Sequence, residues 1–288
     1  MGYSARYHAA SLAAVFLALA IGILIGAGLG DNLLSDTEEN LRESLEADIE
    51  EARGEADELQ ADLDRERAFG DRAYPALVGD TLAGRRIGVV AFGDLPDSVA
   101  SDIEDALEPS GGELASVVVA RIPPDVSAIA DELGPRFDDL DQEPARLREL
   151  ASDVGLQLTA GEGRRLGRLR EAVFTRSSGE GGRLDGAIVF RAAQGELEPE
   201  QQEAAEALEL GMVNGVASSG IPVVAVERSD TDDSSIPFFA PLDVATVDSV
   251  DLTSGRTALV FALLGAEGNF GIKDTANTLL PELLQPAR

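Results

Sequence analysis

The chain has 288 residues, with 23 basic and 53 acidic side chains and a formal net charge of −30. A protein this acidic does not seek nucleic acid or anionic lipid through long-range electrostatics, so nucleic acid is excluded as a partner. The absence of cysteine excludes disulfides, thiolate nucleophiles and cysteine-based metal sites.

The first notable segment is an apolar run over residues 9–30, AASLAAVFLALAIGILIGAGLG, which holds no charged side chain. At about 1.5 Å per residue, a helix of this length spans roughly 30 Å, the thickness of the hydrocarbon core of a bilayer. Arg6 and His8 precede the run and Asp31 follows it. Because positive charge tends to stay in the cytoplasm, residues 1–30 are expected to form a short cytoplasmic tip and a transmembrane anchor.

The alternative for this run is a secretory signal that is cleaved after export. The small residues at 26–28 would suit such a cleavage. A signal, however, usually has only about 7–15 apolar residues, and the charged region before this run is thin. We therefore expect an uncleaved single-pass anchor, with the C-terminal domain on the extracytoplasmic side of the membrane.

Small residues recur every four positions along the apolar run. This spacing places them on one stripe of a helix, which lets two helices approach closely in lipid. The stripe predicts self-association in the membrane, and the alternative is that alanine and glycine are simply common in this composition. Its members are Ala10, Ala14, Ala18, Gly22, Gly26 and Gly30.

Residues 31–72 are expected to form an acidic coiled-coil stalk. Between Asp31 and Arg67 there are fifteen acidic side chains and four arginines, and no proline lies within residues 33–69. Apolar positions alternate in steps of three and four, which is the pattern of a heptad seam. This pattern predicts a parallel homodimer, and a solitary solvated helix is the alternative. The seam comprises Leu45, Ile49, Ala52, Ala56, Leu59 and Leu63.

Residues 79–288 are expected to form one domain in which strands alternate with helices. This alternation is typical of an α/β fold, with a parallel Rossmann-like or flavodoxin-like sheet covered by helices on both faces. The expected strands cover residues 86–94, 114–122, 184–192, 221–227 and 246–247. The expected helices cover residues 96–107, 126–133, 144–154, 162–174, 198–216 and 254–264, and residues 177–182 (SSGEGG) are expected to form a flexible linker.

The chain shows no recognisable catalytic motif. It has no GxGxxG after an expected strand, no phosphate-binding Walker loop, no HExxH and no GxSxG. The single histidine, His8, precedes the apolar run, so the domain beyond it cannot contain a Ser–His–acid triad. We therefore expect a protein that is not an enzyme, with no catalytic or cofactor-binding residue.

In a doubly wound sheet, ligands bind beyond the carboxyl ends of the strands. That rule selects Gly93 and Asp94 after the first expected strand, and Arg191 and Arg228 after two later strands, as crevice residues. The alternative for the two arginines is an ordinary solvated surface position.

No metal site is predicted from the residues. The acidic runs at 138–141 (DDLD) and 230–233 (DTDD) could hold Ca²⁺, but neither has the full pattern of a cation loop, and solvated acidic loops are the alternative. Copper prefers cysteine, methionine and histidine. From Gly79 onward the chain offers only Met212 among these, and that residue is expected on the apolar core face of its helix. We therefore expect this domain to bind no copper tightly.

Two terminal segments give the chain a family resemblance. Residues 6–30 contain His8, Ser11, Phe16, Gly22 and Gly26 in an order that general hydropathy does not require, and residues 265–281 read GAEGNFGIKDTANTLLP. The first segment resembles the N-terminal signature, and the second the closing segment, of the MctB family of actinobacterial copper transport outer membrane proteins. The resemblance implies a membrane-associated envelope protein of copper transport or homeostasis, with copper as the associated metal.

The sequence thus supports two hypotheses about function. The resemblance implies a component of copper transport across the envelope. The stalk and the shortage of copper ligands favour a dimeric envelope scaffold or regulator that acts on cell-wall or division proteins. The expected partners are the lipid bilayer, a second copy of the chain and other envelope proteins.

Overall fold

The structure is a computed structural model that describes residues 5–161, 163–179 and 181–282. Of residues 5–6 and 27–40 it describes the backbone alone. The chain divides into two compact units, Met1–Glu66 and Arg67–Arg288. A single helix, α1 (Ala5–Val78), accounts for the described part of the first unit and extends into the second.

Helix α1 contains the expected membrane span. Residues Tyr7–Gly26 form the one helical segment of the described chain that is long and apolar enough to cross a bilayer. Their side chains are all exposed, and a methyl group added at Gly22 or Gly26 would meet only open space. Gly30, the last member of the expected stripe, lies in residues 27–40, outside the described side chains. Self-association through the stripe stays a prediction.

The heptad seam of the stalk also lies on α1 with its side chains exposed. Ile49 is 48% exposed and Leu59 is 64% exposed in this single chain. A helix stabilises itself little in water unless an apolar stripe is covered, so these side chains are available to a partner helix. The coiled-coil dimer remains a prediction.

The second unit is a seven-stranded sheet with strand order β3-β2-β1-β4-β5-β6-β7. All neighbouring strands are parallel except β3, which pairs antiparallel to β2 at the edge. The predicted α/β class is confirmed, and the order of β2, β1, β4, β5 and β6 is flavodoxin-like. The strands are β1 (Arg86–Phe92), β2 (Glu113–Ala120), β3 (Phe174–Gly179), β4 (Gly186–Arg191), β5 (Val223–Val226), β6 (Ala245–Val247) and β7 (Asn269–Phe270).

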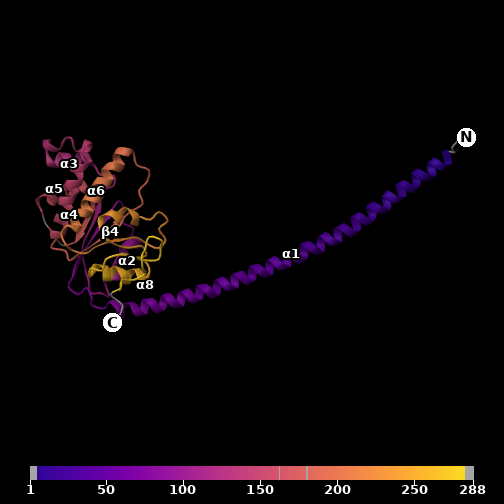
Figure 1. Cartoon of the computed structure of the whole chain (residues 1–288), viewed down its shortest axis with the longest axis horizontal. Helices are drawn as coiled ribbons and strands as arrows, with labels where there is room; N and C mark the ends of the chain where they lie inside the picture. Colours follow the sequence, from indigo (N-terminus) through magenta and orange to yellow (C-terminus); the bar gives the residue numbers. More distant parts are fainter. Residues whose placement is uncertain (1–4, 162, 180, 283–288) are drawn as a thin grey trace. The chain divides into compact units, whose positions relative to one another are not determined.

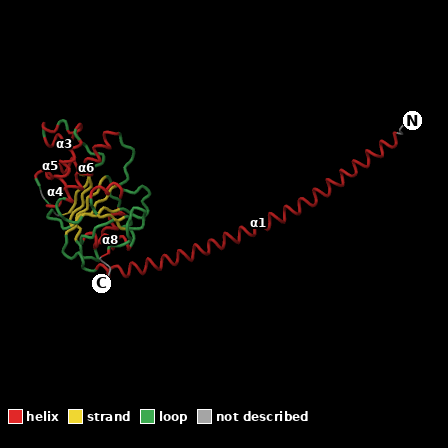
Figure 2. The backbone as a smooth tube through the Cα atoms, in the orientation of Figure 1, coloured by secondary structure: helices red, strands yellow, loops and turns green. Residues whose placement is uncertain are grey.

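Helices cover both faces of this sheet (Figures 1 and 2), because the central strands are apolar on both sides. One face packs against α3 (Val126–Leu133), α4 (Pro144–Ala160), α5 (Arg164–Val173) and α6 (Pro199–Ala217), and Met212 lies in this core as predicted. The other face packs against α2 (Asp97–Leu107), α8 (Thr253–Leu263) and the end of α1. The remaining elements are α7 (Ile236–Phe239) and the 3₁₀ turns η1 (Pro135–Phe137), η2 (Leu140–Gln142) and η3 (Ala240–Leu242).

The prediction of a flexible linker over residues 177–182 is wrong for the first half of that range. Residues up to Gly179 belong to β3, whose backbone pairs with β2 from Phe174 opposite Ala120 to Gly179 opposite Ser116. Five of the six β3 residues are exposed, since an edge strand needs only its backbone to join the sheet. Strand β7 was also not expected, because it is only two residues long.

The end of α1 is part of the second unit. Tyr74 and Val78 are buried in its core, and the Tyr74 hydroxyl donates a hydrogen bond of 2.7 Å to the Ala106 carbonyl oxygen. Burial raises the pKa of Tyr74 far above its ordinary value, so the phenol stays protonated. Asp71 accepts hydrogen bonds of 2.8 Å from both Thr253 and Arg256 of α8. Residues 71–78 therefore attach this stretch of helix to α2 and α8.

Helices α4 and α6 cross at unusually small residues. A methyl group at Gly155 would meet the Met212 carbonyl oxygen, and one at Gly215 would meet the Ser152 carbonyl oxygen. Because these contacts are with backbone, an added methyl can be accommodated only if the two helices separate. The crossing therefore depends on the absence of side chains at these positions.

We predict that Gly155→Ala lowers the free energy of unfolding by about 1–3 kcal/mol through overpacking. Gly167→Ala is the matched control, because Gly167 is an exposed residue of α5 with nothing near its added methyl group. It should leave stability unchanged or raise it by up to about 1 kcal/mol, since alanine favours a helix. Calorimetric unfolding of the full chain in detergent micelles measures both, and equal effects would contradict the prediction.

Candidate functional site

Two clefts lie at the carboxyl edge of the sheet, on either side of the loop that follows β4. The larger, of about 930 Å³, is lined by Arg191 and Arg228. The smaller, of about 500 Å³, is lined by Gly93 and Asp94. Residues 192–195 and Leu197 line both clefts. All four residues selected by the fold rule therefore lie at the expected edge, but Arg191 and Arg228 line one cleft and Gly93 and Asp94 line the other.

This position is the topological switch point of the sheet. From β1 the chain goes to β2 on one side, and later elements return to β4 on the other side. Connections leave the carboxyl ends of β1 and β4 in opposite directions, which opens a crevice between them. The clefts are thus a consequence of strand order.

Arg191, the last residue of β4, is held by a buried carboxylate. Its Nε lies 3.2 Å from Oε1 and 3.1 Å from Oε2 of Glu209 on α6, whose side chain is wholly buried. Gln194 donates a further hydrogen bond of 2.5 Å to Glu209 Oε1. The guanidinium carbon of Arg191 also lies 4.3 Å from the centre of the Phe238 ring. Glu209 and Phe238 therefore fix the guanidinium plane, and Gln194 in turn holds the Glu209 carboxylate.

The environment of Glu209 changes its acidity. Burial raises the pKa of Glu209 to about 7, and the neighbouring charge of Glu206 acts in the same direction. Arg191 and Gln194 oppose the rise by stabilising the carboxylate, but they do not cancel it. Glu209 therefore exchanges its proton near neutral pH, and the net charge of the Arg191–Glu209 pair changes in this range.

Arg228 has a different set of partners. It pairs with Asp102 of α2 and, through Nε at 3.2 Å, with Asp230. Burial raises the pKa of Asp102 and outweighs the opposing effect of Arg228. These acids hold Arg228 at the wall of the larger cleft, with two carboxylates against one cation.

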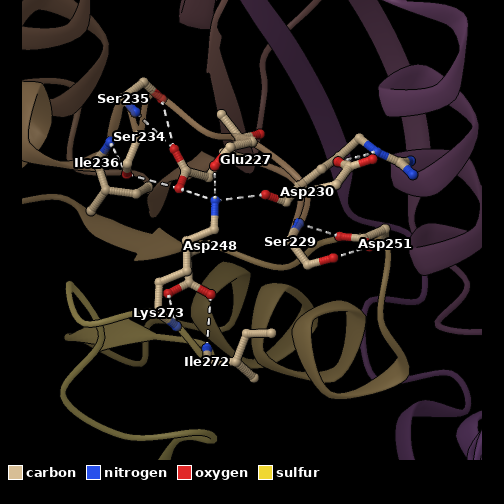
Figure 3. Close-up of polar contacts among 12 residues, drawn as sticks. Glu227, Ser229, Asp230, Ser234, Ser235, Ile236, Asp248, Asp251, Ile272 and Lys273 are labelled. Atoms are coloured by element: carbon tan, nitrogen blue, oxygen red, sulfur yellow. Dashed lines mark hydrogen bonds and ion pairs between the residues drawn. The ribbon is translucent and has the colours of Figure 1, made fainter. Parts of the chain in front are cut away.

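A second buried carboxylate, Glu227, lies directly after β5 and binds the only lysine of the chain (Figure 3). Lys273 Nζ lies 2.9 Å from Glu227 Oε1 and 2.9 Å from each of the carbonyl oxygens of Arg228 and Thr231. Ser234 and Ser235 supply further hydrogen bonds to the same carboxylate. The ammonium group thus ties the segment after β7 to the end of β5.

Asp248, after β6, completes this arrangement (Figure 3). Its carboxylate is buried and accepts hydrogen bonds of 2.8 and 3.0 Å from the backbone nitrogens of Ile272 and Lys273. Asp251 similarly accepts two hydrogen bonds from Ser229. The loops that follow β5, β6 and β7 are therefore connected to one another through carboxylates.

The sequence did not lead us to predict the Arg191–Glu209 pair or the Glu227–Lys273 pair. The burial of Glu209 could have been predicted, because this residue follows Leu208 and precedes Met212 by three residues on the apolar side of a helix. A carboxylate at such a position needs a partner. The only hint for Lys273 in the sequence is that it is the single lysine. Its partner Glu227 lies 46 residues away, and the strand order brings the two together.

The structure gives no support to calcium at the two acidic runs. Asp139 pairs with Arg146 at 2.9 Å, and Asp230 pairs with Arg228. Within the described ranges, no group of three or more His, Cys, Asp or Glu side chains is placed to hold a metal ion.

We predict that Lys273→Met lowers the free energy of unfolding by about 3–5 kcal/mol, because it leaves Glu227 buried without a counter-charge. Combining it with Glu227→Gln should recover much of the loss, since the neutral amide costs less to bury. Calorimetric unfolding measures both variants. If the double variant is as unstable as the single one, the buried charge is not the cause of the loss.

Comparison with known proteins places these features in a family. The family model described as "Copper transport outer membrane protein, MctB" matches residues 3–281. Proteins named "Copper transporter MctB" from Mycobacterium tuberculosis (strain ATCC 25618 / H37Rv), Mycobacterium bovis and Mycobacterium leprae are 32% identical to the chain over 116 residues, or 40% of its length. The match spans 37% of the length of the first two relatives and 36% of the third. Because the family model matches nearly all residues of this chain, the chain belongs to the MctB family.

Proposed function

We propose that this protein is a membrane-anchored component of the cell envelope that takes part in copper transport or homeostasis. The observation that carries the proposal is the family match over residues 3–281. The apolar segment Tyr7–Gly26 supports the membrane location. Copper is the cargo in this proposal, as in the names of the relatives.

The proposed topology is a single pass with the α/β domain outside the cytoplasm. Arg6 and His8 lie before the span, and the acids that begin at Asp31 lie after it. Positive charge retained in the cytoplasm orients the span in this way. The domain would then meet copper and other envelope proteins on the extracytoplasmic side.

The proposed role of the domain is accessory and not enzymatic. From residue 79 onward the sequence has no histidine or cysteine and one methionine, Met212, which is buried in the core. Tight copper sites use thiolate, thioether or imidazole ligands. The domain is therefore better suited to organising other envelope components than to ligating the metal.

A second candidate function is a dimeric scaffold or regulator of cell-wall or division proteins. The exposed seam on α1 favours it, because these apolar side chains are unprotected in a single chain. The two candidates are compatible if a dimeric stalk presents the domain to a copper-handling partner.

We predict that a strain lacking this protein differs from its parent in cellular copper content and in the copper concentration at which growth stops, because copper is the cargo of the proposed function. The full chain should restore both properties, and a form without residues 7–26 should not, because it has lost its anchor. Copper content by mass spectrometry and growth in graded copper measure this, with zinc as the control metal. Unchanged copper content together with altered division septa would replace this function with the second candidate.

We predict that Ala52→Cys and Leu59→Cys each form a disulfide-linked dimer under mild oxidation, because both positions lie on the expected seam. Ala61→Cys is the matched control on the opposite helix face. The absence of native cysteine makes any dimer band on a non-reducing gel attributable to the introduced residue. Equal crosslinking at all three positions would show that the stalk does not pair through this seam.

A further inference from the structure

Arg191 has the arrangement of a prepared anion receptor. Its Nε is occupied by Glu209, and its ring contact with Phe238 fixes the guanidinium plane. Within the part of the chain that the structure describes, no hydrogen bond engages its Nη1 or Nη2, although the side chain lines the larger cleft and is 20% exposed. Two parallel donors of one guanidinium match the two oxygens of a carboxylate.

The surroundings of Arg191 favour an anion with a single charge. Glu196 and Asp233 also line the larger cleft and are exposed, so a dianion would meet repulsion. Ser98, Gln194 and Gln202 offer hydrogen-bonding groups, and Val99 and Leu197 offer apolar surface. Arg228 also lines this cleft, but its guanidinium is paired with Asp102 and Asp230. Arg191 therefore supplies the available positive charge, and together with the amide-binding groups and the apolar surface it suits a peptide more than an inorganic phosphate.

We propose that the larger cleft binds the C-terminal carboxylate of a peptide, with Arg191 as the group that receives it. The cleft volume of about 930 Å³ accommodates several residues, since ligand sites of this kind occupy roughly 300–1,000 Å³. This site is independent of the copper role, and its test does not involve the metal.

Glu209 acts in this site as a positioning residue. The charged groups that act on it are Arg191 from β4 and Glu206 from α6, while Gln194 from the following loop and Phe238 from α7 are neutral. When Glu209 is ionised, its negative charge offsets the positive charge of Arg191. When Glu209 gains a proton, near a pKa of about 7, Arg191 presents its full charge to the ligand. Affinity for a carboxylate should therefore rise as the pH falls from 8 to 6.

The test is calorimetric titration of the full chain in detergent micelles with N-acetyl-trialanine. This probe has one carboxylate that stays ionised over pH 6–8. Its C-terminal amide and inorganic phosphate are the comparison ligands. We expect the free acid to bind, the amide to bind at least about tenfold more weakly, and phosphate to bind more weakly than the acid.

Arg191→Gln should weaken binding of the free acid at least about tenfold. Arg183→Gln makes the same change in net charge at an exposed position outside the cleft and should leave binding unchanged. If Arg191→Gln does not fold because Glu209 is left unpaired, the double variant Arg191→Gln/Glu209→Gln replaces the ion pair with amides. The folded double variant should also lose binding.

Glu209→Gln should keep the free acid bound and remove the pH dependence, which we expect to be about threefold or more between pH 6 and 8. A purely structural role of Glu209 would leave the pH profile unchanged. Unaltered binding in a folded Arg191 variant, equal binding of acid and amide, or tighter binding of phosphate than of the acid would each overturn the proposal.

Discussion

The carboxyl edge of the sheet depends on the pairing of buried carboxylates. In a chain with a net charge of −30, Glu209, Glu227 and Asp248 are each no more than 1% exposed. An unpaired buried charge costs several kcal/mol, so each must find a donor from another segment. Glu209 finds Arg191, Glu227 finds Lys273, and Asp248 finds backbone nitrogens after β7. The first contact attaches the end of β4 to α6, and the other two connect the ends of β5, β6 and β7.

The same contacts determine which surfaces remain open. The loop at 192–198 stays near α6 through Gln194 and Glu209, and residues 228–235 stay near β7 through Lys273. The larger cleft lies between these two loops. Because its walls are fixed by buried ion pairs, the cleft is present before any ligand binds, which lowers the entropic cost of binding. By contrast, the Asp71 side chain is 58% exposed, so its ion pair with Arg256 contributes little to stability. The burial of Tyr74 secures the end of α1.

The sequence was sufficient to predict the central sheet but not its edges. Strands β1, β2, β4 and β5 are short apolar runs between turn residues, and burial on both faces gives them that composition. Strand β3 is mostly polar and ends in Gly179, so its composition resembles a linker, and only pairing with β2 defines it. The fold rule located Arg191 and Arg228 at the correct edge. It could not predict their acidic partners or the two clefts, because those contacts depend on strand order and on loop conformation.

The cations of this chain have two distinct uses. The single lysine has a structural role, because Lys273 neutralises Glu227 and donates hydrogen bonds to two carbonyl oxygens. All other basic side chains are arginines, and Arg191 is the one whose Nε and plane are fixed while its terminal nitrogens stay unengaged within the described residues. Lysine suits the first use because three oxygens can surround a compact ammonium group. Arginine suits the second because one part of its planar fork can be anchored in the protein while the other part faces a ligand. In the proposed site, recognition therefore depends on guanidinium chemistry.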